Sequence, residues 1–312
     1  MAGRLVALTG ATGFLGRALA QALSERGDRL HMLLRPEAEP PAPGEVVAGR
    51  LADLDALGRL VEGADLVIHA AGLIKARRPQ DFQPVNVQGV RDIARLTAER
   101  APGARFLLIS SLSAREPGLS AYAASKAEAE AVARQALAPE RLTIVRPPAI
   151  YGPGDRETLA LFRAALSLPV LPLPGPDEAR LALIHVADAA GQILALADHP
   201  ARPDAFALAD ARAEGYGWRE IMRAAAVAVG RRKAPLVRVP AALILGLGAA
   251  NSLIGRLGGE PRIMTLGKAR EALHPDWSVS AAERAPAQAG CRFDLGSGFA
   301  DSVAWYRARG WL

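Results

Sequence analysis

A glycine-rich turn near the N-terminus is the feature that most constrains the fold. The short apolar run Leu5–Thr9 leads into GATGFLG at residues 10–16, and a helical pattern follows over Arg17–Glu25. Glycines at this spacing between a strand and a helix allow a tight turn, close approach of the backbone to a pyrophosphate, and close packing of the helix on the strand. The positive end of the helix dipole then faces the anion. The start of the chain therefore predicts the first βαβ unit of a dinucleotide-binding sheet.

The first half of the chain continues to alternate strand-like and helical segments. The expected strands are Leu5–Thr9, Leu30–Leu34, Leu66–Ala70, Phe106–Ser110 and Leu142–Val145, and the expected helices are Arg17–Glu25, Leu54–Val61, Val87–Glu99 and Ala121–Ala136. This alternation is typical of a parallel sheet covered by helices, and right-handed crossovers make such a sheet doubly wound. We therefore expect an α/β fold with a doubly wound parallel sheet (Rossmann) and a second, smaller mixed C-terminal lobe.

The pattern changes beyond Pro147, where prolines interrupt regular structure repeatedly. A strand at Leu181–Val186 and a helix at Ala187–Ala197 are expected to rejoin the sheet. The predicted dinucleotide-binding domain is thus residues 1–148 plus about 182–210, and the predicted substrate-binding lobe is about 149–181 plus 211–312.

Composition excludes several classes of protein. The chain is 50% hydrophobic and 22% charged, which argues against disorder. Its single cysteine, Cys291, can form neither an intrachain disulfide nor a thiolate metal cluster, so we expect a cytoplasmic protein without a metal. The net charge is +6, but arginines are spread along the chain without an aromatic platform between them, so nucleic acid is not an expected partner.

One apolar segment, Val239–Ile254, needs a separate interpretation. It is shorter than the roughly 20 residues that span a bilayer, and Pro240, Gly246, Gly248, Asn251 and Ser252 fall within it. A buried or surface-docked helix without membrane contact is the expected structure. Contact with one face of a membrane remains the alternative.

Several motifs along the first two thirds of the chain occur in the order of one known family. They are TGATGFLG at residues 9–16, HAAG at 69–72, VNVQG at 85–89, Ser110-Ser111, YAASK at 122–126, RPPAIYGPGD at 146–155 and HVAD at 185–188. In these motifs the chain resembles the extended short-chain dehydrogenase/reductase (NAD-dependent epimerase/dehydratase-like) superfamily. The resemblance implies a nicotinamide dinucleotide cofactor, a small-molecule substrate and a homodimer.

Tyr122 and Lys126 are the expected catalytic pair. Their i, i+4 spacing places both on one face of a helix, where a lysine ammonium favours the phenolate and lowers the pKa of the tyrosine. The resemblance implies that Ser111 is the third catalytic residue, hydrogen-bonded to the substrate oxygen, and that Ser110 faces the structure. The alternatives are that the two serines exchange roles or that both only cap the strand.

The resemblance also implies which residues contact the cofactor. The expected contacts are Gly10, Thr12, Gly13, Phe14, Leu15, Gly16, Arg17, Arg35, Leu51, Ala70, Ala71, Gly72, Asn86, Tyr122, Lys126, Pro147 and Ile150. For Asn86 a helix N-cap is an equal alternative. His69 and His185 are expected to be structural, and Lys75, Arg77 and Arg78 to lie in a solvated loop or, alternatively, to meet an acidic group of the substrate.

The end of the second strand bears on which dinucleotide binds. An NAD enzyme places a carboxylate there for the ribose 2′-hydroxyl, whereas this chain has Arg35, and Arg17 could add a second clamp on a 2′-phosphate. NADP(H) is therefore favoured over NAD(H). The family's usual acid after the third strand is replaced by Arg50, which cannot accept from the adenine amino group, and Asp53 is expected as a helix N-cap.

Three functions compete. The favoured one is an oxidoreductase that transfers hydride between NADP(H) and a secondary alcohol or ketone, with Tyr122 as the acid/base. The second is a nucleotide-sugar epimerase or dehydratase, but Leu112 and Ser113 stand where the resembling dehydratases carry Asp-Glu, and Ala149 where many epimerases carry Asn. The third is a non-catalytic dinucleotide-binding protein, which has no need for the intact Ser111, Tyr122 and Lys126.

Overall fold

The computed structural model describes residues 3–199, 205–256, 265–284 and 290–312. These residues form two compact units. The described residues of unit 1 are 3–147, 190–199 and 205–207, and those of unit 2 are 148–189, 208–256, 265–284 and 290–312.

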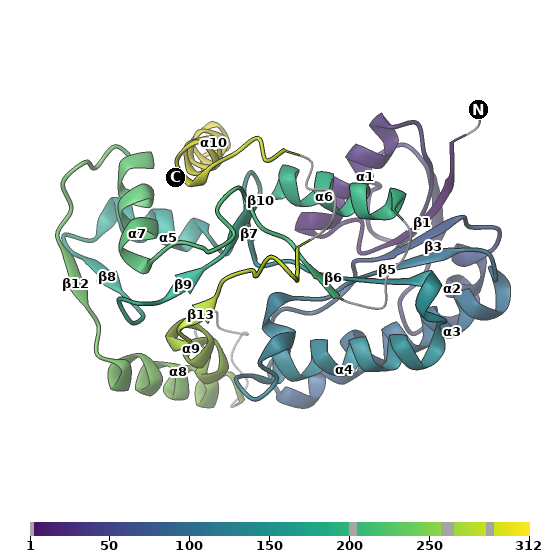
Figure 1. Cartoon of the computed structure of the whole chain (residues 1–312), viewed down its shortest axis with the longest axis horizontal. Coiled ribbons are helices and arrows are strands. Elements are labelled where there is room, and N and C mark those ends of the chain that lie inside the picture. The colour runs from purple at the N-terminus through teal and green to yellow at the C-terminus, as the bar shows by residue number, and fades with distance from the viewer. Residues whose placement is uncertain (1–2, 200–204, 257–264, 285–289) are drawn as a thin grey trace. The chain divides into compact units, whose positions relative to one another are not determined.

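Unit 1 is built on a parallel sheet (Figure 1). Among the described residues this sheet has seven strands: β1 (Leu5–Thr9), β2 (Arg29–Leu34), β3 (Glu45–Ala48), β4 (Leu66–His69), β5 (Arg105–Ile109), β6 (Leu142–Arg146) and β11 (Ala205–Ala207). Their spatial order is β11-β6-β5-β4-β1-β2-β3, and every neighbouring pair is parallel. The predicted doubly wound parallel sheet is confirmed. Its topological switch point lies between β1 and β4, where ligands bind in sheets of this kind.

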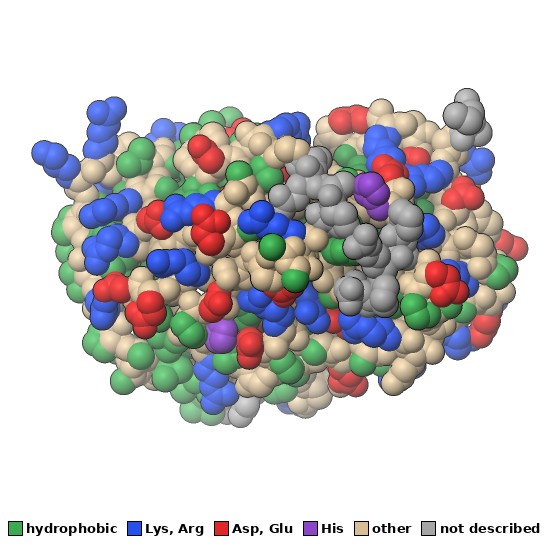
Figure 2. All heavy atoms as spheres, in the orientation of Figure 1, with side chains coloured by type: hydrophobic (Ala, Val, Ile, Leu, Met, Phe, Trp, Pro, Cys, Tyr) green, Lys and Arg blue, Asp and Glu red, His purple; other side chains and the backbone are tan. Residues whose placement is uncertain are grey.

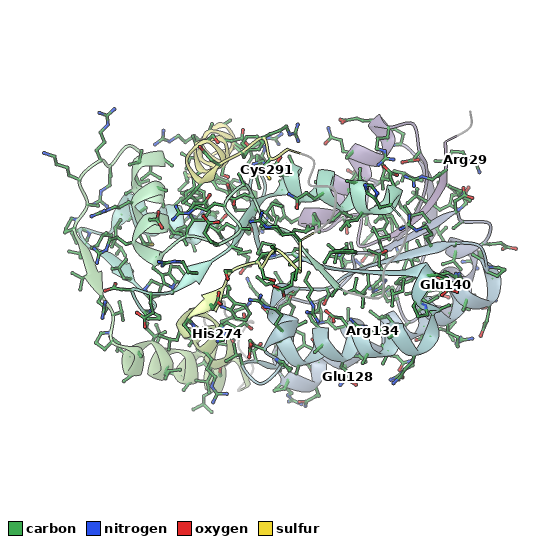
Figure 3. All side chains as sticks on the ribbon, viewed as in Figure 1. Arg29, Glu128, Arg134, Glu140, His274 and Cys291 are labelled. Atoms are coloured by element: carbon green, nitrogen blue, oxygen red, sulfur yellow. The ribbon has the colours of Figure 1, made fainter. Side chains whose placement is uncertain are left out.

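Helices cover both faces of this sheet (Figure 1). They are α1 (Phe14–Glu25), α2 (Leu54–Val61), α3 (Gly89–Arg100), α4 (Ala121–Ala136) and α6 (Val186–Asp198), the last of which begins in unit 2 and continues in unit 1. In Figure 1, α2, α3 and α4 lie on one side of the strands and α1 on the other. Figure 3 labels Glu128 and Arg134 on α4, the helix that carries the expected catalytic pair.

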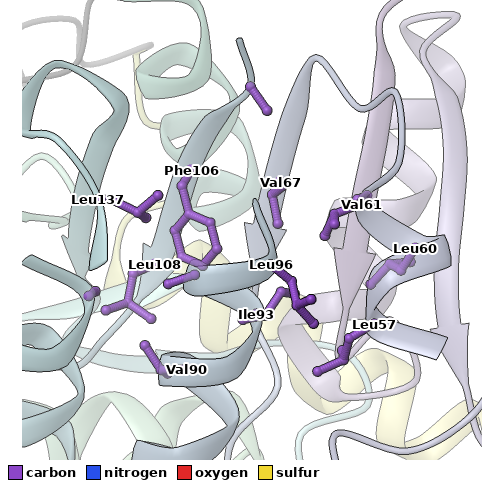
Figure 4. Close-up of a cluster of buried hydrophobic side chains, with 14 of the residues drawn as sticks. Leu57, Leu60, Val61, Val67, Val90, Ile93, Leu96, Phe106, Leu108 and Leu137 are labelled. Carbon is purple, nitrogen blue, oxygen red and sulfur yellow. The ribbon is translucent and has the colours of Figure 1, made fainter. Parts of the chain in front are cut away.

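The core between the sheet and the helices α2 and α3 is apolar (Figure 4). Leu57 and Leu60 of α2 and Ile93 of α3 are fully buried, together with Phe106 and Leu108 of β5. Full burial of such a side chain contributes about 1.5–3 kcal/mol relative to exposure. This core makes the sheet a rigid platform for the loops at the carboxyl ends of its strands.

Several element boundaries differ from the sequence expectation. α1 begins at Phe14 rather than Arg17, so the glycine turn leads directly into the helix. The expected strand Leu181–Val186 is confirmed only in part: the chain forms β9 (Arg180–Leu181) and β10 (Leu183–His185), with Ala182 donating to the carbonyl of Trp277 between them. β10 pairs with β7 rather than rejoining the seven-stranded sheet, so that part of the expectation is wrong. β3 was implied only by the resemblance, which places Arg50 after a third strand, because its short, exposed sequence carries little apolar signal of its own.

Unit 2 is organised around an aromatic core. Tyr151, Phe162, Phe299 and Tyr306 are fully or almost fully buried, and their rings pack at centroid distances of 5.0–5.8 Å. The helices are α5 (Leu159–Ser167), α7 (Trp218–Ala228), α8 (Ala241–Arg256), α9 (Leu266–Leu273) and α10 (Leu295–Ala308). Short parallel pairs join β7 (Ala149–Tyr151) to β10, β8 (Leu171–Leu173) to β12 (Leu236–Arg238), and β9 to β13 (Asp276–Trp277).

Charged side chains of both signs are interspersed on the face shown in Figure 2. The apolar segment that includes Val239–Ile254 forms α8, as expected, but large side chains of this helix are exposed, so it is not a buried helix. Among the described residues, no helix combines the length and hydropathy needed to cross a membrane.

Candidate cofactor and active site

In the glycine turn after β1, two positions require glycine, each for a different steric reason. Gly10 has a φ of +76°, and a Cβ there would lie 2.6 Å from the backbone nitrogen of Ala71, so the turn approaches the end of β4 closely. A Cβ on Gly16 would collide with the carbonyl oxygen of Gly10. Gly13 is exposed, and as the N-cap of α1 it provides no side-chain cap for the first turn. The amides at the start of α1 are therefore oriented as an anion-binding site requires.

The other expected contacts in this turn follow from its geometry. Thr12, Phe14 and Leu15 are half-buried within it. The exposed Arg17 folds back over the turn, and its Nε donates to the carbonyl oxygen of Thr12 at 3.0 Å. A guanidinium held at this position adds positive charge beside the helix N-terminus.

Two arginines meet at the end of β2. Arg35 directly follows the strand and Arg50 follows β3, and their guanidinium nitrogens lie 3.8 and 3.5 Å from the same oxygen of Glu37. All three side chains are exposed. Arg35 was an expected contact, whereas the participation of Arg50 and Glu37 was missed. The i+2 spacing of Arg35 and Glu37 was visible in the sequence, but the approach of Arg50 depends on the pairing of β2 with β3.

The loop after β4 is fixed by a buried asparagine. Asn86 accepts from the backbone nitrogen of Leu73 at 2.7 Å and donates to the carbonyl of Leu73 at 3.0 Å and to Ser125 Oγ at 2.9 Å. Asn86 lies inside a π-helix (Gln83–Gln88), whereas the N-cap of α3 is Gln88, so the N-cap alternative for Asn86 is wrong. Its amide instead joins the Ala70-Ala71-Gly72 loop to α4.

Gly72 brings this loop next to the expected catalytic helix. A Cβ at Gly72 would lie 3.4 Å from Asn86 Oδ1 and 3.7 Å from Lys126 Nζ. A Cβ at this position would therefore be in ordinary van der Waals contact with both groups.

Lys126 is buried, and its Nζ donates to the carbonyl oxygen of Ile109 at 2.7 Å. This bond connects α4 to the end of β5, immediately before the two serines. Burial lowers the pKa of Lys126 to about 8, and the negative charge of Glu130 opposes that shift. Near neutral pH the ammonium form therefore still predominates.

Glu130 lies one further turn along α4 and was missed by the sequence interpretation. Its buried carboxylate accepts from Ser110 Oγ at 2.6 Å and from two nitrogens of Arg146 at 2.8 and 2.7 Å. The i+4 spacing from Lys126 was the available signal. Ser110 thus bonds into the protein interior, in the manner expected of the serine that faces the structure.

Ser111 begins the short 3-10 helix Leu112–Arg115, and its Oγ accepts from the backbone nitrogen of Ser113 at 3.2 Å. Tyr122 lies one helical turn before Lys126 in α4, and its half-buried ring packs on Phe82 with a centroid distance of 6.0 Å. Ser120 caps this helix by accepting from Ala123 at 3.0 Å. The cap positions Tyr122 in the first turn of α4, on the same side of the helix as Lys126.

His69, at the end of β4, is buried beside this site. Burial is the main cause that lowers its pKa to about 3, and the nearby charge of Lys126 adds to the effect, so the imidazole is neutral. Its Nδ1 is 2.9 Å from Thr9 Oγ1, and its Nε2 is buried without a hydrogen-bond partner among the described residues. No group of three or more His, Cys, Asp or Glu side chains in the described ranges could hold a metal ion.

The remaining expected residues are distributed between the two units. Leu51 packs on Gly89 at the start of α3, and Pro147 accepts from the backbone of Leu112 at 2.8 Å, so both belong to unit 1. Ile150 lies in β7 of unit 2. Asp53 is the N-cap of α2, accepting from Ala56 at 2.9 Å, and the expected cap is thereby confirmed.

A dinucleotide fits the groups that unit 1 provides. The uncapped α1 N-terminus suits a pyrophosphate, and the side chain-free positions at Gly13 and Gly72 leave the backbone open beside it. Lys126, Asn86 and the loop after β4 meet at the switch point of the sheet, where folds of this kind bind their ligands.

Comparison with known proteins identifies the family and several relatives. The model of the NAD dependent epimerase/dehydratase family matches residues 6–209. The chain is 49% identical to a ceramide reductase of Caulobacter vibrioides over 99% of this chain and 96% of that protein. It is 33% identical to a 2-alkyl-3-oxoalkanoate reductase of Stenotrophomonas maltophilia, over 49% of this chain and 52% of that one.

Solved structures with the same fold include that of gox2253, with a TM-score of 0.74 at 24% identity over 98% of both chains. An NAD-dependent NDP-hexosamine 5,6-dehydratase, TunA, matches with a TM-score of 0.72 at 21% identity, also over 98% of both. At these identities the structural matches establish the fold alone.

Proposed function

Because this chain belongs to the NAD-dependent epimerase/dehydratase family, whose members depend on a nicotinamide dinucleotide, we propose that it is an NADP(H)-dependent reductase of a ketone on a long-chain lipid. The product of this reaction is a secondary alcohol. The observation that carries the proposal is the 49% identity to a ceramide reductase, because it extends over 99% of this chain and therefore includes unit 2.

Unit 2 is assigned the recognition of the substrate. Family membership alone leaves the reaction open, since one fold supports many activities. The similarity to the 2-alkyl-3-oxoalkanoate reductase also favours a keto substrate with alkyl chains. A ceramide-like lipid carrying a ketone is therefore the substrate class we assign.

The chemistry of the reduction assigns one role to each catalytic residue. Bound NADPH would supply the hydride to the carbonyl carbon. Ser111 would hydrogen-bond the carbonyl oxygen and polarise it, and Tyr122 would donate its phenolic proton to that oxygen as the alkoxide forms. Lys126, held against Ile109, would stabilise the resulting phenolate through its positive charge.

The preference for NADP(H) rests on the arginines around the end of β2. Arg35 and Arg50 both approach Glu37, and a 2′-phosphate offers two guanidinium groups a stronger anionic partner than one shared carboxylate. A carboxylate that accepts from a free ribose 2′-hydroxyl would favour NAD(H) instead, and Glu37 is already engaged by the two arginines. Replacing both arginines by alanine is expected to reduce the preference for NADPH over NADH.

The test is oxidation of NADPH, followed by its absorbance, with a short-chain keto-ceramide in detergent. The wild type is expected to consume NADPH, and Tyr122→Phe to lose about 10²–10⁴-fold of that rate while it still binds NADPH. Phe82→Leu, which changes only the ring packed on Tyr122, serves as the control that should retain most activity. Interconversion of nucleotide sugars without net turnover of the cofactor would overturn the proposal. The homodimer and the cytoplasmic location implied by the sequence remain predictions.

A further inference from the structure

The exposed side of α8 is composed of apolar residues alone. Leu243, Leu247, Leu253 and Ile254 are 42–64% exposed, and the other exposed positions of this helix are alanines and Gly246, among the residues whose side chains are described. At 100° per residue the four large side chains fall on one arc of the helix. Figure 2 shows the resulting hydrophobic side chains over α8, at the lower left.

Ser252 of α8 faces the opposite side of the helix, toward α9. Ser252 Oγ donates to the carbonyl of Gly248 at 2.8 Å and accepts from the backbone nitrogen of Leu266 at 2.9 Å. Gly248 is buried, and a Cβ there would lie 2.9 Å from the Cβ of Ala269. Ser252 and the buried Ile244 thus lie against the protein, whereas four large apolar side chains face the exterior, where a surface helix usually carries polar groups.

All the charged residues in the segment of sequence around this helix are basic. Residues 221–259 contain six Arg or Lys and no Asp or Glu, although a stretch of that length would carry about four acids at the average of the chain. Arg223, Arg232, Lys233 and Arg238 are exposed, and Arg238 forms an ion pair with Asp177. Arg270 of α9 adds a further exposed cation. Arg223, Arg232 and Lys233 belong to α7 and the segment between α7 and β12, away from α8 (Figure 1). The exposed cations next to α8 are Arg238, which precedes it, and Arg270 of α9, which packs on it, and these two suit an anionic surface.

We propose that α8 docks the protein on the surface of an anionic phospholipid bilayer, with Leu243, Leu247, Leu253 and Ile254 inserted among the lipid chains. The helix has 16 residues and is about 24 Å long, so it lies in the interface rather than crossing a hydrocarbon core of about 30 Å. Arg238 before the helix and Arg270 of the neighbouring α9 then contact the headgroups, as cations do in other interfacial helices.

A bilayer fits this face better than another protein does. Protein interfaces carry about one hydrogen bond per 100–200 Å² and combine apolar with polar groups, whereas the exposed positions of α8, among the residues whose side chains are described, carry no polar side chain. The acyl region of a lipid layer requires no such groups. The inference uses only α8 and its surroundings, so it stands whether or not the proposed reduction is correct.

The test is flotation of the full-length protein with vesicles, which needs no substrate or cofactor. Binding is compared on vesicles of phosphatidylcholine alone and of phosphatidylcholine with 30–40% phosphatidylglycerol, a fraction chosen to be roughly that of a strongly anionic membrane. The wild type is expected to bind the anionic vesicles, and to do so more weakly as salt is raised.

The double variant Leu243→Glu/Leu247→Glu is expected to lower binding about tenfold or more, because it places two charges in the inserted face. Leu54→Glu is the matched control, since Leu54 is 44% exposed at the start of α2 in unit 1, and it should bind as the wild type does. Circular dichroism confirms that both variants are folded.

Absence of vesicle binding by the wild type would overturn the proposal. Equal binding by the wild type and the double variant would also do so. Light scattering adds a third decisive result: a wild-type dimer that the two glutamates convert to a monomer, with no vesicle binding, assigns this face to a second copy of the chain.

Discussion

At the scale of one residue, burial has two opposing effects on Lys126: it fixes the ammonium group in place, and it disfavours the charged form. Burial against the carbonyl of Ile109 fixes the position of its ammonium group but lowers its pKa to about 8, and Glu130 limits that shift. Glu130 therefore favours the charged form of Lys126, and its carboxylate accepts hydrogen bonds from Arg146 and Ser110. In our proposal this arrangement sets the pH range of activity, which can be tested.

Glu130→Gln is expected to move the alkaline decline of kcat/KM to lower pH. In the wild type, activity should fall as pH rises through about 8, because Lys126 loses the proton that stabilises the Tyr122 phenolate. Without the negative charge of Glu130 the pKa of Lys126 falls further, so the decline begins earlier. Glu128→Gln makes the same exchange at an exposed position of the same helix and should leave the profile unchanged. An unshifted profile in Glu130→Gln would contradict this role.

A second prediction at the scale of one residue concerns His69 and the pH dependence of the free energy of unfolding. Its pKa is lowered to about 3 in the folded state from 6.5, so the unfolded chain binds the proton first as the pH falls. The stability of the folded protein is therefore reduced progressively below pH 6.5, by about 2 kcal/mol between pH 7 and pH 5 from this group.

Urea unfolding at pH 7 and pH 5 measures this effect. His69→Gln is expected to show a smaller loss of stability between the two pH values than the wild type, by about 2 kcal/mol. The exposed His199 provides the comparison, since His199→Gln should keep the pH dependence of the wild type. The interpretation fails if both variants respond to pH in the same way.

At the scale of the elements, the junction of β1 with α1 contains one glycine that the fold requires and another that we expect to matter for ligand binding. Gly16 is required by the fold, because a Cβ there would collide with the carbonyl oxygen of Gly10. At Gly13 a Cβ would lie 3.2 Å from that same oxygen, which is tight but requires only a small adjustment, and the position is exposed. A methyl group added to Gly13 therefore mainly affects a ligand.

We expect Gly16→Ala to lower the melting temperature by several degrees, as a loss of about 1–3 kcal/mol does in a protein of this size. Gly13→Ala should melt close to the wild type but bind NADPH at least tenfold more weakly, measured by nucleotide fluorescence. A normal affinity in Gly13→Ala would show that the pyrophosphate does not approach this turn.

The same elements show what a sequence can and cannot predict. α2 and α4 have the predicted bounds, because capping residues and helical periodicity are local signals. The Tyr122–Lys126 pairing follows from that periodicity. The link between Glu130 and Arg146 depends on β6 reaching the side of α4, and the exposure of Leu243 depends on α9 covering the other side of α8. Such relations between distant segments are not encoded in any single stretch.

At the scale of the whole molecule, the two units have separate cores and, in our proposal, separate tasks. The core of unit 1 is the aliphatic layer between the sheet and its helices, and the core of unit 2 is the aromatic cluster around Phe162 and Phe299. The groups suited to a dinucleotide, from the glycine turn to Lys126, all belong to unit 1, whereas α8 belongs to unit 2. Binding of the cofactor and docking on a bilayer should therefore be separable.

Hydrogen–deuterium exchange can measure this separation across the chain. With NADPH at about 100 times its dissociation constant, exchange should slow most, by up to about 100-fold, in residues 10–17, 70–73 and 109–126, because openings that expose the cofactor site become costlier by about 2.7 kcal/mol. Anionic vesicles without NADPH should instead protect α8 and leave the glycine turn unchanged. If NADPH protected α8 as strongly as the turn after β1, the two functions would not be independent, and the assignment of one task to each unit would be wrong.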